Sequence, residues 1–136
     1  MTIHKRLREQ RGVASLEFVL ILPILLFVLF VSVELSRAWF TLNLLTTAAR
    51  EAVRVGVVSA PGSVQSNATA RLTALLGPAG QPPINWSATV SCNPNPCVPD
   101  SQVRVNVTAN FHTVLPDLLP MLGSITLQQT ASMRYE

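Results

Sequence analysis

The residues of clearest chemical interest are a glycine and a glutamate five positions apart, Gly12 and Glu17, at the start of an apolar run. The run, FVLILPILLFVLFVSV from Phe18 to Val33, contains no charged residue. A carboxylate inside such a segment costs on the order of 2.5 to 3.5 kcal/mol when the segment enters a bilayer. Glu17 is therefore the first candidate functional residue. The cations of the preceding leader are Lys5, Arg6, Arg8 and Arg11.

The length of the apolar run predicts one transmembrane helix. Extended back to Val13, it has twenty-one residues interrupted only by Glu17. At about 1.5 Å per residue it spans roughly 32 Å, close to the thickness of a hydrocarbon core. Basic charge precedes the run, whereas Glu34 and Arg37 cancel after it. The positive-inside rule therefore places the N-terminus in the cytoplasm and the C-terminal part outside the inner membrane.

The distribution of charge excludes a nucleic-acid-binding surface as the first interpretation. The net charge of +3 is confined to the first twelve residues, because from Val13 onward six arginines face six acids. A basic cluster at one end, next to an apolar run, is typical of a topogenic signal. We expect a membrane lipid partner and no nucleic acid.

Three other interpretations of this segment remain open. A secretory signal peptide would be cut after Ser36-Arg37-Ala38, which would make Trp39 the first residue. An uncleaved signal anchor would keep the leader. In the third, Gly12 is an incidental helix boundary and Glu17 reaches the cytoplasmic headgroups by snorkelling.

The order of basic leader, Gly12, four small or apolar residues and Glu17 resembles the type IV prepilin processing site. The resemblance implies that a prepilin peptidase cuts between Gly12 and Val13, leaving Glu17 and Phe18 near the new end. It also implies that Glu17 pairs with the ammonium of Val13 or of a neighbouring subunit. Such a pair offsets much of the desolvation cost that either charge alone would have.

The helix is expected to continue well past the membrane, to about residue 58, since no proline follows Pro23 until Pro61. Pro23 itself should kink or loosen it. An apolar stripe for packing on a domain or a neighbour consists of Leu35, Trp39, Leu42, Leu45, Ala49, Val53 and Gly56. Trp39 and Phe40 serve equally well as membrane-interface anchors, and the sequence leaves that choice open.

A second point of resemblance is the stretch LLTTAAREAVRVG, with Arg50, Glu51 and Arg54, together with the tail TASMRYE. With the processing motif, these segments resemble the TadE-like minor pilins, or pseudopilins, of the tight-adherence (Tad/Flp) type IV pilus. The resemblance implies a role in pilus assembly or initiation, adherence and biofilm formation. The partners it implies are a prepilin peptidase, other minor pilins, the major Flp pilin and the inner-membrane assembly platform. Arg50, Glu51 and Arg54 are candidate subunit contacts.

The remaining chain, residues 59–136, predicts a small α+β domain in the periplasm. A second helix begins at Ser63 as its cap, and its apolar face contains Val64, Ala68, Leu72, Leu75 and Leu76. Three alternating segments, 84–92, 103–111 and 125–135, predict a three-stranded antiparallel sheet with one apolar face. The two helices are the only candidates to cover that face, which gives a pilin-like domain.

The only cysteines, Cys92 and Cys97, flank four residues between the first two strands. Outside the membrane the compartment is oxidising, so we predict a disulfide that closes this loop. A redox-active pair usually has the spacing CxxC, and a zinc site needs more ligands than His112 adds. We therefore expect no metal and no cofactor.

The connection between the second and third strands is unusually apolar, HTVLPDLLPMLG. Leu118, Leu119 and Met121 there are candidate subunit contacts if exposed, or else cover the open end of the sheet.

The ionisable residues after Val13 form no recognisable catalytic pattern, so an enzyme is not expected. The function that the sequence supports best is a minor pilin of a Tad/Flp pilus, with residues 1–12 cleaved and residues 13–58 as the long helix. The alternative is an uncleaved, single-pass, membrane-anchored binding domain that faces the periplasm.

Overall fold

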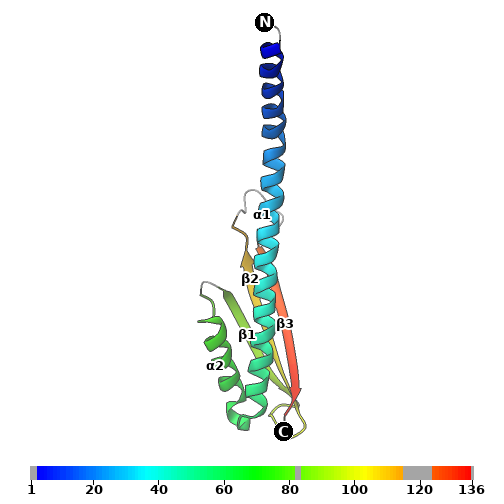
Figure 1. The fold of residues 1–136 in the computed structure, drawn as a ribbon. Coiled ribbons are helices and arrows are strands. Elements are labelled where there is room, and N and C mark those ends of the chain that lie inside the picture. Colours follow the sequence, from blue (N-terminus) through cyan, green and yellow to red (C-terminus); the bar gives the residue numbers. More distant parts are fainter. Residues whose placement is uncertain (1–2, 82–83, 115–123, 136) are drawn as a thin grey trace. The chain divides into compact units, whose positions relative to one another are not determined.

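The computed structural model describes residues 3–81, 84–114 and 124–135, with side chains from residue 15 onward (Figure 1). The elements in chain order are α1 (Ile3–Val57), the short 3-10 helix η1 (Pro61–Ser63), α2 (Val64–Leu76), β1 (Asn85–Asn93), β2 (Gln102–His112) and β3 (Ser124–Arg134). The predicted α+β class, with a long apolar helix, a second helix and three strands, is confirmed. The chain divides into two compact units, Met1–Arg37 and Ala38–Glu136.

The first unit consists of the N-terminal part of α1. The helix begins at Ile3, so the leader is helical as well, whereas the sequence predicted a helix from Val13. Pro23 lies inside α1. Apolar side chains cover this part of the helix and lie exposed; Phe18 and Leu20 are representative, at 62% and 69% exposed.

The second unit contains the antiparallel sheet, in the order β1-β2-β3. The central strand β2 places Val103, Val105 and Val107 on its inner face, and all three are fully buried. The outer face is polar, and its side chains form hydrogen bonds between neighbouring strands. One example joins the hydroxyl oxygens of Ser87 and Thr108, which are 2.7 Å apart. In β2 the predicted alternation is therefore the alternation between core and solvent, whereas the apolar residues of β3 are at most half-buried and Met133 is 46% exposed.

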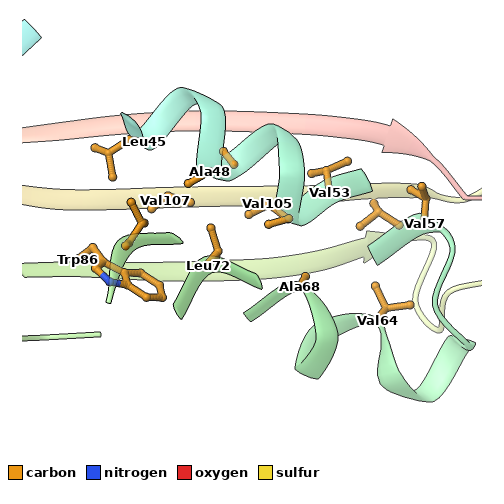
Figure 2. Packing of buried hydrophobic residues seen from close by; sticks show 14 of the residues in the cluster. Leu45, Ala48, Val53, Val57, Val64, Ala68, Leu72, Trp86, Val105 and Val107 are labelled. Atoms are coloured by element: carbon orange, nitrogen blue, oxygen red, sulfur yellow. The ribbon is translucent and has the colours of Figure 1, made fainter. Parts of the chain in front are cut away.

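Both helices cover the inner face of the sheet, and one core joins them to β1 and β2 (Figure 2). α2 contributes Val64, Ala68, Leu72 and Leu76, as its spacing predicted, with Leu75 partly buried. Within the second unit, the buried residues of α1 are Leu45, Ala48, Ala49, Ala52, Val53, Gly56 and Val57. Small residues recur in that set, which allows the helix backbone to approach its neighbours closely.

Of the predicted stripe on α1, the part from Leu45 onward packs in the core of the domain, whereas its earlier members do not; their packing on a neighbour stays a prediction. Trp39 is 65% exposed and Leu35 is 69% exposed, so neither packs on the domain. Periodicity alone shows that residues share a helix face, but not where along the helix a partner begins.

The prediction that the side chain of Ser63 caps α2 was wrong. Ser63 precedes the helix, but it makes no side-chain capping bond. Its hydroxyl instead donates to the carbonyl of Ala60 (3.0 Å), because Ser63 ends the 3-10 turn that Pro61 begins. At the other end, Gly77 has a φ of 83°, the left-handed conformation that glycine adopts without strain, and its N–H reaches Thr73 O (2.9 Å).

The end of the chain is fastened to the turn between the helices. Tyr135 follows β3, is 5% exposed, and its hydroxyl donates to the carbonyl of Ser59 (2.6 Å). Its backbone N–H donates to Ser101 O (2.8 Å), and its carbonyl accepts from the N–H of Asp100 (2.9 Å). These bonds close the end of the domain opposite Trp86.

Candidate functional site

The apolar part of α1 is the most distinctive functional feature of the described chain. From Ser15 to Val57 it is a helix of 43 residues, and its most apolar window has a mean hydropathy of 2.8 with none of that window buried within the molecule. Among the described residues it is the one helix long and apolar enough to cross a membrane. Sequence and structure therefore agree on the membrane-spanning candidate.

Glu17 lies on this helix with an exposed side chain, next to Phe18, which is also exposed. The structure thus presents the carboxylate and the first aromatic ring of the run on the helix surface, where a second molecule can reach them. The backbone of Gly12 and Val13 is helical, and the side chains of the leader, Lys5, Arg6, Arg8 and Arg11, lie outside the described part. Glycine lowers helix propensity by about 1 kcal/mol relative to alanine, so the helix opens more easily at Gly12 than at its neighbours.

At the other end of the apolar run, Glu34 and Arg37 form an ion pair one helical turn apart. One guanidinium nitrogen, Nη1 of Arg37, donates to both carboxylate oxygens of Glu34 (2.9 and 3.0 Å). The sequence indicated that these two charges cancel, and the structure shows that they do so through direct contact. The apolar run consequently ends without net charge.

The charged residues of the AAREAVR stretch do not act as one group. Glu51 faces α2 and forms an ion pair with Arg71 (3.6 Å), with both side chains about two-fifths exposed. Arg50 and Arg54 are exposed on α1, and no ion pair of either one occurs within the described residues. Arg71 is the partner that the sequence reasoning missed, because the contact joins two helices whose packing no local pattern shows.

The predicted disulfide between Cys92 and Cys97 is present, with the two Cα atoms 5.3 Å apart. It closes the loop that follows β1. Beside it lies a cavity of about 260 Å³ between this loop and the start of α2. Its lining residues are Pro61, Gly62, Val64, Gln65, Val90, Ser91, Cys92, Asn95, Pro96 and Cys97. They offer apolar, amide and hydroxyl groups, with no ionisable side chain among them.

The remaining candidate residues from the sequence are those of the apolar connection before β3, and His112. Leu118, Leu119 and Met121 lie outside the described residues. His112 is exposed at the end of β2. In the described ranges no three residues of the metal-binding types lie close enough together to hold an ion.

These features define a class of protein: an α+β domain whose first helix carries a long, exposed apolar segment with one carboxylate near its start. A comparison with protein families confirms the resemblance stated above, because the family model described as TadE-like protein matches residues 12–54. The match begins at Gly12 and ends at Arg54, so it covers Gly12 and Glu17, the apolar run and the AAREAVR stretch, and stops before the sheet. No curated protein and no solved structure matched the chain. Over residues 12–54 the chain is therefore similar to TadE-like proteins.

Proposed function

We propose that this chain is a minor pilin, or pseudopilin, of a Tad/Flp type IV pilus, taking part in pilus assembly or initiation and so in adherence and biofilm formation. The observation that carries the proposal is the coincidence of the TadE-like match with Gly12 and Glu17 at the start of an exposed apolar helix. The precursor enters the inner membrane with its basic leader in the cytoplasm and its sheet domain in the periplasm.

Cleavage between Gly12 and Val13 is the first step of this proposal. Glycine leaves the scissile bond unobstructed and weakens the helix around it. The cut removes the +3 charge of the leader and creates an ammonium at Val13. The product has an apolar helix of zero net charge from residue 13 to residue 33 once Glu17 pairs with an ammonium.

Pairing of Glu17 is the second step. Alone in an apolar bundle, a carboxylate or an ammonium is costly, whereas a close pair of the two offsets most of that cost. The requirement for a partner therefore favours the arrangement in which Glu17 lies beside the Val13 ammonium of its own or a neighbouring subunit. The exposed residues Arg50 and Arg54 are proposed as further contacts with other subunits.

The test is an intact-mass measurement with N-terminal sequencing of the full chain expressed with and without a prepilin peptidase. The expected result is a new N-terminus at Val13 that depends on the peptidase. Gly12→Leu should block the cut, because its side chain obstructs the scissile bond. An intact leader in every sample would favour the uncleaved, membrane-anchored binding domain, and a start at Trp39 would indicate a secreted domain.

The role of Glu17 is tested separately with Glu17→Gln, which keeps the shape of the side chain and removes its charge. This variant should insert and be cleaved, but should not support pilus assembly when shed pili are counted. Asp100→Asn is the matched control, because it also removes one carboxylate, but from an exposed ion pair with Arg134 in the sheet domain. Normal piliation by Glu17→Gln would contradict the charge-pairing step.

A further inference from the structure

The exposed surface of α1 changes character within one helical turn. Up to Phe40 most of the exposed large side chains are apolar, with Glu17 and Arg37 as charged exceptions, and Trp39 and Phe40 are the last two apolar ones, at 65% and 69% exposed. The next exposed residues along the helix are Asn43, Thr47, Arg50 and Arg54. At about 100° per residue these four share one arc of the helix, and Trp39 and Phe40 flank it on either side.

The core of the domain lies on the opposite arc of the same helix, where burial begins at Leu45. Trp39 and Phe40 therefore do not belong to the core. Indole and phenyl rings that are excluded from a core, at the end of a membrane-spanning segment, have a favoured location at the boundary between lipid and water.

We propose that Trp39 and Phe40 anchor α1 in the lipid–water interface on the periplasmic side of the membrane. The occupant of this surface is the interfacial layer of the bilayer itself. The exposed apolar side chains of α1 begin at Leu16 and continue, past Ser36 and the Arg37 of the ion pair, to Trp39 and Phe40, whereas the exposed residues that follow on the helix are polar.

The length of helix between Glu17 and Phe40 fits this placement. Twenty-three residues at about 1.5 Å each span about 35 Å, the hydrocarbon core plus part of one interface. Glu17 then lies at the cytoplasmic boundary and the aromatic pair at the periplasmic one. The membrane segment consequently extends beyond Val33, where the uncharged run stops.

The ion pair of Glu34 with Arg37 makes this longer segment possible. Both charges fall on the membrane side of Trp39, within two turns of the boundary. Arg37 satisfies both carboxylate oxygens of Glu34, so the two residues enter the interface as a neutral pair rather than as separate charges.

A consequence is that the folded domain lies close to the membrane surface. Leu45 is only five residues past Phe40, a rise of about 8 Å along the helix. Leu45 and Trp86 occupy one end of the core, and Val57 and Val64 the other (Figure 2). The end of the core with Leu45 and Trp86 is therefore the end nearer to Phe40 along α1.

The test uses the fluorescence of the full chain in vesicles of phosphatidylcholine brominated near the carbonyl, at mid-chain or near the terminal methyl. The chain has two tryptophans, and Trp86 is 2% exposed with its indole N–H bonded to Gly77 O (3.0 Å). The difference between wild type and Trp39→Phe thus reports Trp39 alone. We expect the Trp39 fluorescence to be quenched most by bromine near the carbonyl. The remaining fluorescence of Trp39→Phe, which comes from Trp86, should be quenched little by any of the brominated lipids.

Two variants that carry a tryptophan at another position of α1 serve as standards for the depth of Trp39 in the bilayer. In the Trp39→Phe background, Val33→Trp should be quenched most by deep bromine, and Thr47→Trp should be quenched less than Trp39 by every brominated lipid. Quenching of Trp39 mainly by deep bromine, or by aqueous iodide instead of any brominated lipid, would overturn the anchor. So would quenching that fades as the protein-to-lipid ratio rises, because a second copy would then cover Trp39.

The inference rests on the membrane insertion included in the proposed function, and on neither cleavage nor pilus assembly. Flotation of the vesicles separates the two failures. A chain that floats with lipid but shows no shallow quenching contradicts only the anchor, whereas a chain that does not float contradicts membrane insertion as well.

Discussion

At the scale of single residues, the two tryptophans show how position decides the effect of a side chain. Trp86 fills the core and donates a hydrogen bond to Gly77 O, whereas Trp39 is mostly exposed. Trp86→Phe should lower the free energy of unfolding by about 1–3 kcal/mol, because Gly77 O loses its partner and a gap opens. Trp39→Phe should change it by less than about 0.5 kcal/mol. Hydrogen exchange of the β2 amides in detergent measures both, and equal effects would contradict this assignment of core and surface.

Gly56 offers a second prediction at this scale, because it lies near the end of α1 where three elements meet. A Cβ built on it would lie 3.5 Å from side-chain carbons of Val103 and Val64, an ordinary contact distance. Gly56→Ala should therefore leave the packing intact and stabilise the helix by up to about 1 kcal/mol. Gly56→Leu should destabilise the domain by about 1–3 kcal/mol through overpacking. Thermal unfolding of the two variants side by side tests this, and destabilisation by alanine would show that the space is tighter than these distances indicate.

At the scale of elements, the disulfide acts on one loop and not on the sheet. β1 and β2 pair over nine positions, from Asn85 with Asn110 to Asn93 with Gln102. Replacing Cys92 and Cys97 by serine should lower the free energy of unfolding by at most about 2 kcal/mol. The reason is that a crosslink across so short a loop removes little chain entropy from the unfolded state. Amide exchange in β2 should remain slow. A reductant should reproduce the loss in the wild-type chain and have no effect on the variant, and loss of the whole sheet would contradict a local role.

The contact between the two helices is expected to depend on apolar packing more than on charge. Glu51 and Arg71 are 3.6 Å apart and both are well exposed to solvent. A double-mutant cycle with Glu51→Gln and Arg71→Gln should give a coupling free energy below about 1 kcal/mol, falling further at high salt. The cycle is measured by chemical denaturation, with Leu72→Ala as the comparison that removes a fully buried side chain at a cost of about 2–5 kcal/mol.

At the scale of the whole molecule, Tyr135 joins the end of the sheet to the turn after α1, across 76 positions of sequence. Tyr135→Phe removes only the hydroxyl and leaves the carbonyl of Ser59 without that donor. We expect the free energy of unfolding to fall by about 1–2 kcal/mol. Arg134→Gln is the matched control, because its ion pair with Asp100 is largely exposed and should contribute little. If both variants unfold at the same denaturant concentration, the tyrosine does not fasten the chain end.

Sequence patterns predicted most of the elements, because each pattern is local. The alternation of Val103, Val105 and Val107 with polar residues indicated a half-buried strand, and all three are buried. The apolar run from Phe18 to Val33 predicted a helix apolar enough to cross a membrane, and the spacing of Val64, Ala68 and Leu72 predicted the inner face of α2. The Gly12 and Glu17 motif belongs to the same kind of information, since a family model finds it in the sequence.

Tertiary structure decided where those patterns meet a partner. The apolar residues that recur from Leu35 to Leu45 predict packing along the helix but do not show that the core begins only at Leu45. The pairing of Glu51 with Arg71, the bond of Tyr135 to Ser59 and the exposure of Trp39 all depend on contacts between segments far apart in the chain. The physical reason is that periodicity specifies the direction of a side chain relative to its own backbone, whereas burial and pairing depend on what the rest of the chain places in front of it.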